Sequence, residues 1–91
     1  MKRCLKMLVS LENWQSEWGL KIQKQAQKLA IEGMMQAVDE NHLRIMVCGE
    51  GEKLDEFMDY LDDFFLKVDA RISELEPFIK ERDYRGIFRV I

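Results

Sequence analysis

Several residue types are scarce in this chain of 91 residues, and each scarcity excludes a class of protein. The chain has one histidine, His42, and two cysteines, Cys4 and Cys48, without a Cys-x-x-Cys motif. These residues offer no set of transition-metal ligands, so we expect neither a metal nor a cofactor. Pro77 is the only proline, and no Pro/Ser-rich linker or internal repeat divides the chain. We therefore expect a single domain over residues 1–91 with one modest core.

Long apolar runs are also missing. Lys6 and Ser10 interrupt the apolar residues near the N-terminus, which excludes a secretory signal and a membrane span there, so we expect a cytoplasmic protein with no membrane partner. Cys4 and Cys48 are far apart in sequence and have apolar neighbours. That pattern is typical of buried, reduced thiols, so we expect no disulfide.

Positive charge is too scarce for a nucleic-acid partner. The formal net charge is −3, and no basic stripe compensates for it, so phosphates would be repelled. Residues 50–69 contain eight carboxylates and two lysines, a local net charge of −6. Because this acidic block falls on a predicted helix, we interpret it as a solvated helix face rather than a docking surface for a basic partner.

The residues that are present alternate between strand and helix patterns. Hydrophobic periodicity predicts a strand at 4–11, a helix at 21–30, a hairpin with strands at 34–39 and 43–48, a helix at 54–65, and strands at 70–76 and 87–91. Gly33 is a natural stop for the first helix. The spacing of Ile72 and Leu75 indicates a bulge or a change of face, and Pro77 ends that strand or marks an edge. Residues 80–83 are predicted to form a charged loop.

This order of elements predicts an α+β fold. A ferredoxin-like α/β sandwich, βαββαβ plus a short C-terminal strand, places two helices on one face of a mainly antiparallel sheet and buries both helix stripes. The residues expected in its core are Val9, Ile22, Leu29, Ile45, Val47, Leu54, Phe57 and Leu61.

The stretch from residue 11 to 20, between the first strand and the first helix, bears most directly on function. A strand that leads through a short turn into a helix commonly binds anions, because free backbone N–H groups converge with the positive end of the helix dipole. Such a turn needs small residues and no negative charge. This one contains a single glycine, the carboxylates Glu12 and Glu17, and the indoles Trp14 and Trp18. We interpret it as a phosphate loop that has lost its chemistry.

The chain resembles the acylphosphatase family along nearly its whole length. The matching stretches are Gln25-Ala-Gln-Lys-Leu-Ala-Ile-Glu-Gly33, similar to the family's A-R-x-L-G-L-x-G; Val47-Cys-Gly-Glu-Gly51 before the second helix; Phe57 and Leu61 at F-x-x-x-L; residues 70–76, similar to A-R-V-x-x-V-x; and residues 84–90, similar to Y-x-G-F-x-I. The resemblance implies a small ferredoxin-like domain. Members of this family hydrolyse acyl phosphates without a metal.

The catalytic motifs of that family do not follow. An ungapped alignment from Ala26 places Gly19 where the family has the arginine that grips the phosphate, and Ala37 where it has the asparagine that positions the attacking water. The resemblance therefore implies no catalytic residue and a degenerate phosphate loop, which comprises Asn13, Trp14, Gln15, Ser16, Glu17, Trp18 and Gly19. The cradle glycines fall on Gln15 and Glu17. A carboxylate beside a phosphate dianion opposes binding.

Some roles in and around this loop stay open. A shifted register would make Lys21 the cation and Asn13 or Asn41 the water ligand, although lysine lacks the bidentate fork of arginine. The indoles are either exposed anchors for a ligand or, as we favour, include at least one that caps the core. Glu12 and Glu17 are read as solvated carboxylates rather than an acid/base pair, and His42 as an exposed turn residue rather than a catalyst.

The resemblance to the acylphosphatases, together with the loss of their catalytic arginine and asparagine, predicts a catalytically silent acylphosphatase-like domain. It would act as a binding or protein-interaction module for a protein partner or a small ligand, neither of which the sequence identifies. The alternative is a divergent acylphosphatase with residual hydrolysis of acyl phosphates. An RNA-binding sheet would need aromatic strand motifs and positive charge, and both are absent from the sequence. The oligomeric state stays open.

Overall fold

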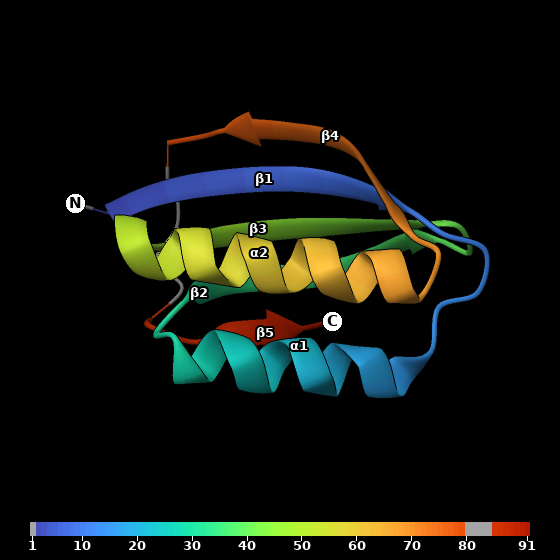
Figure 1. Cartoon of the computed structure of the whole chain (residues 1–91), viewed down its shortest axis with the longest axis horizontal. Helices are drawn as coiled ribbons and strands as arrows, with labels where there is room; N and C mark the ends of the chain where they lie inside the picture. The colour runs from blue at the N-terminus through green and yellow to red at the C-terminus, as the bar shows by residue number, and fades with distance from the viewer. Residues whose placement is uncertain (1, 80–84) are drawn as a thin grey trace.

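The computed structural model describes residues 2–79 and 85–91. Within these residues the elements are β1 (Lys2–Ser10), α1 (Ser16–Lys28), β2 (Glu32–Asp39), β3 (His42–Glu50), α2 (Gly51–Lys67), β4 (Arg71–Pro77) and β5 (Phe88–Val90). The strands form a single sheet of order β4-β1-β3-β2-β5, in which β5 runs parallel to β2 and the other neighbours are antiparallel. Both helices lie on one face of this sheet (Figure 1). The predicted ferredoxin-like sandwich is confirmed.

The core lies between the sheet and the two helices. Helix α1 packs on β2 and β5, whereas α2 packs on β1, β3 and β4. Side chains alternate between the two faces of a strand, so every second residue of β1 and β3 turns toward the helices. All of the residues predicted for the core are buried, among them Val9, Ile45 and Leu61, each with no exposed surface.

The first helix begins and ends differently from the prediction. It starts at Ser16 rather than Lys21, so residues 16–19 of the degenerate loop are helical. Gly33 does not end it. The chain instead leaves the helix through Ala30, which adopts a left-handed conformation with φ of 55°, and the N–H of Ile31 donates to the oxygen of Ala26.

Gly33 lies inside β2, where it serves strand pairing. Its φ is 148°, and a Cβ placed there would overlap the carbonyl oxygen of Met46 on β3. A glycine at this position therefore allows close approach of two backbones and has no part in helix termination.

The edges of the sheet agree with the sequence in most respects. The β1–β4 register shifts between Leu8 and Val9, which is the predicted bulge, and Ser73 Oγ donates to the carbonyl oxygen of Leu8 at 3.1 Å. Strand β4 is an edge strand that ends at Pro77. The last strand covers only 88–90, shorter than the predicted 87–91. The predicted charged loop at 80–83 and Tyr84 lie outside the described residues.

Cys4 and Cys48 form a disulfide between β1 and β3, so the expectation of two reduced thiols is wrong. The two residues are direct partners in the β1–β3 register, with their Cα atoms 4.1 Å apart. Opposite residues of an antiparallel ladder alternate between hydrogen-bonded and non-hydrogen-bonded pairs. Because the N–H of Leu11 donates to the backbone oxygen of Asn41, Ser10–His42 is a non-hydrogen-bonded pair. Cys4–Cys48 lies an even number of positions along the ladder and is therefore of the same type, in which the side chains stand closest together.

Candidate functional site

The loop between β1 and α1 runs into the first turn of α1. Gln15 is the N-cap residue with an extended backbone, and its side chain makes no capping hydrogen bond. The N–H of Trp18 donates to the carbonyl oxygen of Gln15 at 3.0 Å, while Ser16 and Glu17 are exposed in the first turn. A carboxylate in a first turn interacts favourably with the helix dipole. The chain's own Glu17 therefore provides the negative charge that this helix end favours.

Gly19 is buried on the side of α1 that faces β5. A Cβ at this position would lie 2.8 Å from Cγ1 of Val90 and 3.4 Å from Cζ2 of Trp14. Real Cβ atoms essentially never come within 3.0 Å of a neighbour, so even an alanine would require Val90 to move. The position that the resemblance assigns to the phosphate-gripping arginine thus admits a side chain only if Val90 shifts.

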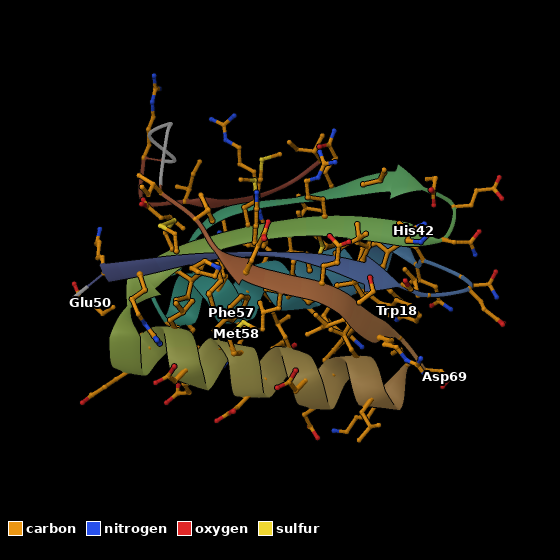
Figure 2. All side chains as sticks on the ribbon, turned by 90° about the horizontal axis from the view of Figure 1, so that it is seen from above. Trp18, His42, Glu50, Phe57, Met58 and Asp69 are labelled. Atoms are coloured by element: carbon orange, nitrogen blue, oxygen red, sulfur yellow. A yellow bond between two sulfur atoms is a disulfide. The ribbon has the colours of Figure 1, made fainter. Side chains whose placement is uncertain are left out.

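The two indoles of the loop pack against the core. The rings of Trp14 and Trp18 meet edge to face with centroids 5.6 Å apart, and Trp18 meets Phe64 of α2 in the same way at 6.1 Å. Both tryptophans are partly buried against the core cluster, and Trp18 lies on the helix-bearing side of the sheet in Figure 2. Our preference for an indole as a cap on the core therefore applies to both.

Ala37 and the loop line one shallow hollow. Its volume is about 560 Å³, and its lining residues are Glu12, Asn13, Trp14, Ala37, Asp39 and Glu40. The structure thus brings Ala37 beside Asn13 and Trp14. Three of the lining side chains are carboxylates, and none of the described residues that line the hollow is a lysine or an arginine. These charges oppose the binding of a phosphate.

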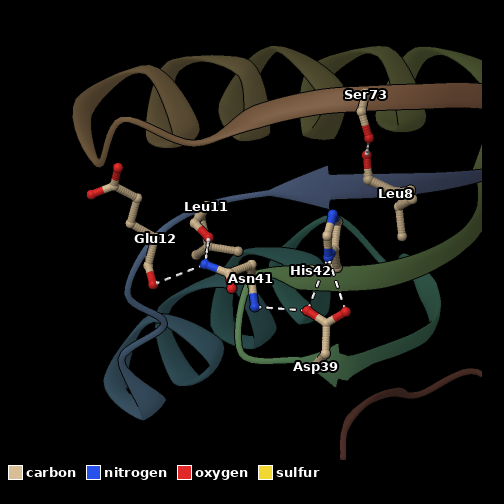
Figure 3. Close-up of polar contacts among 7 residues, drawn as sticks. All are labelled: Leu8, Leu11, Glu12, Asp39, Asn41, His42 and Ser73. Atoms are coloured by element: carbon tan, nitrogen blue, oxygen red, sulfur yellow. Dashed lines mark hydrogen bonds and ion pairs between the residues drawn. The ribbon is translucent and has the colours of Figure 1, made fainter.

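The β2–β3 turn keeps one of those carboxylates ionised. The N–H of Asn41 donates to Oδ1 of Asp39 at 2.7 Å, and Nδ1 of His42 lies 2.9 Å from the same oxygen (Figure 3). The Asn41 hydrogen bond first, and then the His42 side chain, hold the pKa of Asp39 below its ordinary value of 3.8. His42 is half-buried at the start of β3, which differs from the exposed turn residue expected. In the sequence, the i,i+3 spacing of Asp39 and His42 was the signal that could have predicted this contact.

Asn41 connects this turn to the loop. Its Nδ2 donates to the carbonyl oxygens of Leu11 at 3.1 Å and Glu12 at 3.4 Å, and the N–H of Leu11 donates to its backbone oxygen at 2.9 Å (Figure 3). The side-chain amide is therefore engaged in holding two segments together. Lys21 is exposed on α1 and does not line the hollow. The geometry does not support the shifted register, with Lys21 as the cation and Asn41 as the water ligand.

Neither a protein-family model nor a curated protein matches the sequence, but solved structures match the fold. The acylphosphatase of Coxiella burnetii superposes with a TM-score of 0.74 at 19% identity, over 99% of this chain and 93% of that one. The acylphosphatase of Bacillus subtilis superposes with a TM-score of 0.72 at 14% identity, over 100% of this chain and 99% of that one. The chain has the acylphosphatase fold.

The acylphosphatase-like fold also occurs within a much larger protein. The HypF of T. kodakarensis superposes with a TM-score of 0.73 at 16% identity over 98% of this chain, which spans only 12% of that protein. At these identities the match shows the fold alone, so the assignment of Gly19 and Ala37 to the family's catalytic positions stays a prediction. Across the described residues, no cluster of three or more His, Cys, Asp or Glu side chains is placed to hold a metal. No helix in that part of the chain is long and apolar enough to cross a membrane.

Proposed function

We propose that this acylphosphatase-like domain does not hydrolyse acyl phosphates and instead serves as a binding or interaction module. The observation that carries the proposal is the packing of Gly19 against Val90 and Trp14. A guanidinium at this place would need a side chain where those two residues already lie. Without a preorganised cation, the developing charge of the transition state has no stabilising partner, a loss that typically costs orders of magnitude in rate.

The charge of the hollow supports the same conclusion. Glu12, Asp39 and Glu40 line the space beside Ala37, and Asn41 and His42 keep Asp39 ionised. An incoming phosphate would meet carboxylates at the place where a phosphate loop offers N–H donors and a cation.

The module role rests on two further observations. The acylphosphatase-like fold makes up a small part of the larger HypF, so the fold is compatible with service inside an assembly. Leu20 of α1 and Val90 of β5, together with the adjacent Ile91, expose 60%, 37% and 66% of their surface, on two elements that pack together. A contiguous patch of exposed apolar side chains is typical of interaction surfaces, and Leu20 and Val90, on elements that pack together, are the candidates for such a patch.

The alternative of a divergent acylphosphatase receives no comparable support. Lys21 lies away from the lining of the hollow, and the side-chain amide of Asn41 already donates to the loop backbone. Asn13 is the remaining polar amide in the lining, and a single amide without a cation leaves the phosphate charge uncompensated.

The decisive experiment is benzoyl phosphate turnover by the pure protein, with amide spectra recorded during a titration with inorganic phosphate. We expect no saturable turnover above the uncatalysed rate, and no phosphate-dependent shifts for residues 12–19 and 37–40. Saturable turnover at a rate typical of enzymes, about 1 s⁻¹ or more, would overturn the proposal and make Lys21 the first residue to mutate.

Matched variants test separately whether activity is limited by the absence of the arginine and asparagine or by the lack of space beside Gly19. Gly19→Arg with Ala37→Asn restores the two residue types but forces the arginine against Val90, whereas adding Val90→Ala gives the arginine room. We expect weak activity at most from either variant, because Glu12, Asp39 and Glu40 remain. Strong activity in the triple variant would show that the hollow's charge does not oppose the chemistry.

The proposed role as an interaction module is tested in a separate experiment. It compares the capture of partner proteins by the wild type with their capture by a Leu20→Glu, Ile91→Glu variant. We expect specific capture that this variant loses while its amide spectrum stays native. Equal capture by both proteins would contradict an interaction surface on α1 and β5.

A further inference from the structure

The Cys4–Cys48 bridge lies at the opposite end of β1 from the hollow beside Ala37. Alternate residues of a strand share a face, so Cys4 shares one with Lys2 and Lys6 while Met7 and Val9 turn toward the helices. Cys48 is buried but is not a member of the hydrophobic core cluster. The sulfur atoms therefore lie on the sheet face that carries no helix, the side opposite α2 in Figure 2.

A hollow of about 720 Å³ opens onto this bridge. Cys4 and Cys48 both line it, together with Lys2, Arg3, the buried carboxylate Glu32 and an apolar wall that includes Phe78 and Ile79. Ligand pockets of small molecules fall in this range of volume. A small thiol therefore has space to approach the sulfur atoms without unfolding the sheet.

The two cysteines have different surroundings. Cys48 is 1% exposed, whereas Cys4 is half-buried and is flanked on its own face by the exposed lysines Lys2 and Lys6. Nζ of Lys6 also lies 3.1 Å from a carboxylate oxygen of Glu76 on β4. Glu50 and Glu76 lie opposite Lys2 and Lys6 in the strand register, so carboxylates balance these cations. The difference between the two cysteines therefore comes from exposure and from Glu32, the register partner of Cys48, because burial and a nearby carboxylate both disfavour a thiolate. In the reduced protein Cys4 is thus the better nucleophile, and Cys48 is placed to attack it from directly across the strand pair.

We propose that Cys4 and Cys48 form a thiol–disulfide exchange site for a small thiol and its disulfide. The Cys4 thiolate attacks one sulfur of the small disulfide, whose S–S bond breaks and releases one thiolate, leaving a mixed disulfide on Cys4. Cys48 then loses its proton to solvent and attacks Cys4 Sγ, which forms the bridge and releases the second thiolate. The dithiol is oxidised by two electrons and the small disulfide is reduced to two thiols.

The sheet can accommodate both redox states. The β1–β3 register runs without interruption from Lys2–Glu50 to Ser10–His42, so backbone pairing holds the two cysteines opposite each other whether or not they are bonded. This inference is independent of the proposed silent site, because it uses the other end and the other face of the sheet.

The test uses the full chain, reduced and mixed with oxidised glutathione, then quenched with acid and analysed by mass spectrometry. We expect Cys48→Ser to accumulate one glutathione adduct on Cys4, and Cys4→Ser to react at least about tenfold more slowly at Cys48.

Two results would overturn the proposal. They are equal rates for the two single-cysteine variants, and a wild-type bridge that millimolar reduced glutathione leaves intact. Amide spectra recorded before each reaction establish that every variant is folded, so that slow reaction reports on the site and not on misfolding.

Discussion

A Cβ at Gly19 or at Gly33 would overlap a neighbouring atom, but the neighbours differ in kind. At Gly19 a Cβ would meet the side chains of Val90 and Trp14, so the constraint comes from packing between α1, the loop and β5. At Gly33 it would meet the backbone oxygen of Met46, so the constraint comes from two strands in close approach. A side chain can shift more readily than a paired strand. Substitution of Gly33 should therefore be the more damaging of the two.

Asp39 offers a direct measurement at the residue scale. We expect its carboxyl to titrate below 3.8, because the Asn41 N–H and then the His42 ring stabilise the charged form. Because the pKa in the folded state lies below that of the unfolded chain, its contribution to stability is present above pH 3.8 and is lost as the pH falls through the lower folded value. The carboxyl carbon signal followed by NMR against pH gives the midpoint.

A matched variant separates the two causes of this shift. His42→Ala should move the midpoint upward but not all the way to 3.8, since the larger contribution from Asn41 remains. A midpoint at or above 3.8 in the wild type would contradict the hydrogen bonds described for this turn.

At the scale of the element, α2 divides into two faces. Its buried residues, Leu54, Phe57, Leu61 and Phe65, recur at helical spacing. Every carboxylate between residues 50 and 69 is exposed. The carboxylates of the acidic block are therefore exposed, away from the buried residues of α2.

Two leucines of α2 test this division. Leu61 has no exposed surface, whereas Leu66 exposes 79% of its own. We expect Leu61→Ala to lower the free energy of unfolding by about 2–5 kcal/mol through lost burial and a cavity. Leu66→Ala should change it by less than about 0.5 kcal/mol. Urea unfolding measures both. A similar loss in the two variants, or a loss below about 0.5 kcal/mol at Leu61, would contradict this packing.

At the scale of the whole molecule, the bridge joins strands that are neighbours in space and distant along the chain. Cys4 and Cys48 are separated by 44 residues, and closing a loop of that length restricts the unfolded chain. The chain-entropy argument gives about 4 kcal/mol, to be read as an upper value because reduced unfolded chains retain structure.

We therefore expect reduction to lower the free energy of unfolding by up to about 4 kcal/mol while the fold persists. The uninterrupted β1–β3 register and the core on the opposite face hold the reduced protein together. Urea unfolding with and without reductant gives the difference, and the Cys4→Ser, Cys48→Ser variant should not respond to reductant. Coincident oxidised and reduced curves for the wild type would show that the bridge does not constrain the unfolded chain.

The sequence by itself determined the types and order of the elements, the hairpin, and the part of the core that was predicted from periodicity, and it offered the bulge before Pro77 as one of two alternatives. These features follow from local periodicity and turn chemistry, which are present in any stretch of ten or so residues. It also indicated that residues 13–19 are poor in glycine and acidic, which already disfavours a phosphate loop.

Only the tertiary structure decided how distant segments meet. The Cys4–Cys48 bridge depends on the register of β1 against β3, and the closed position at Gly19 depends on Val90, which lies near the other end of the chain. The use of the Asn41 amide likewise depends on where the β2–β3 turn meets the loop. A sequence pattern carries the period of each element. Register and side-chain contact between elements are set by the packing of the whole core.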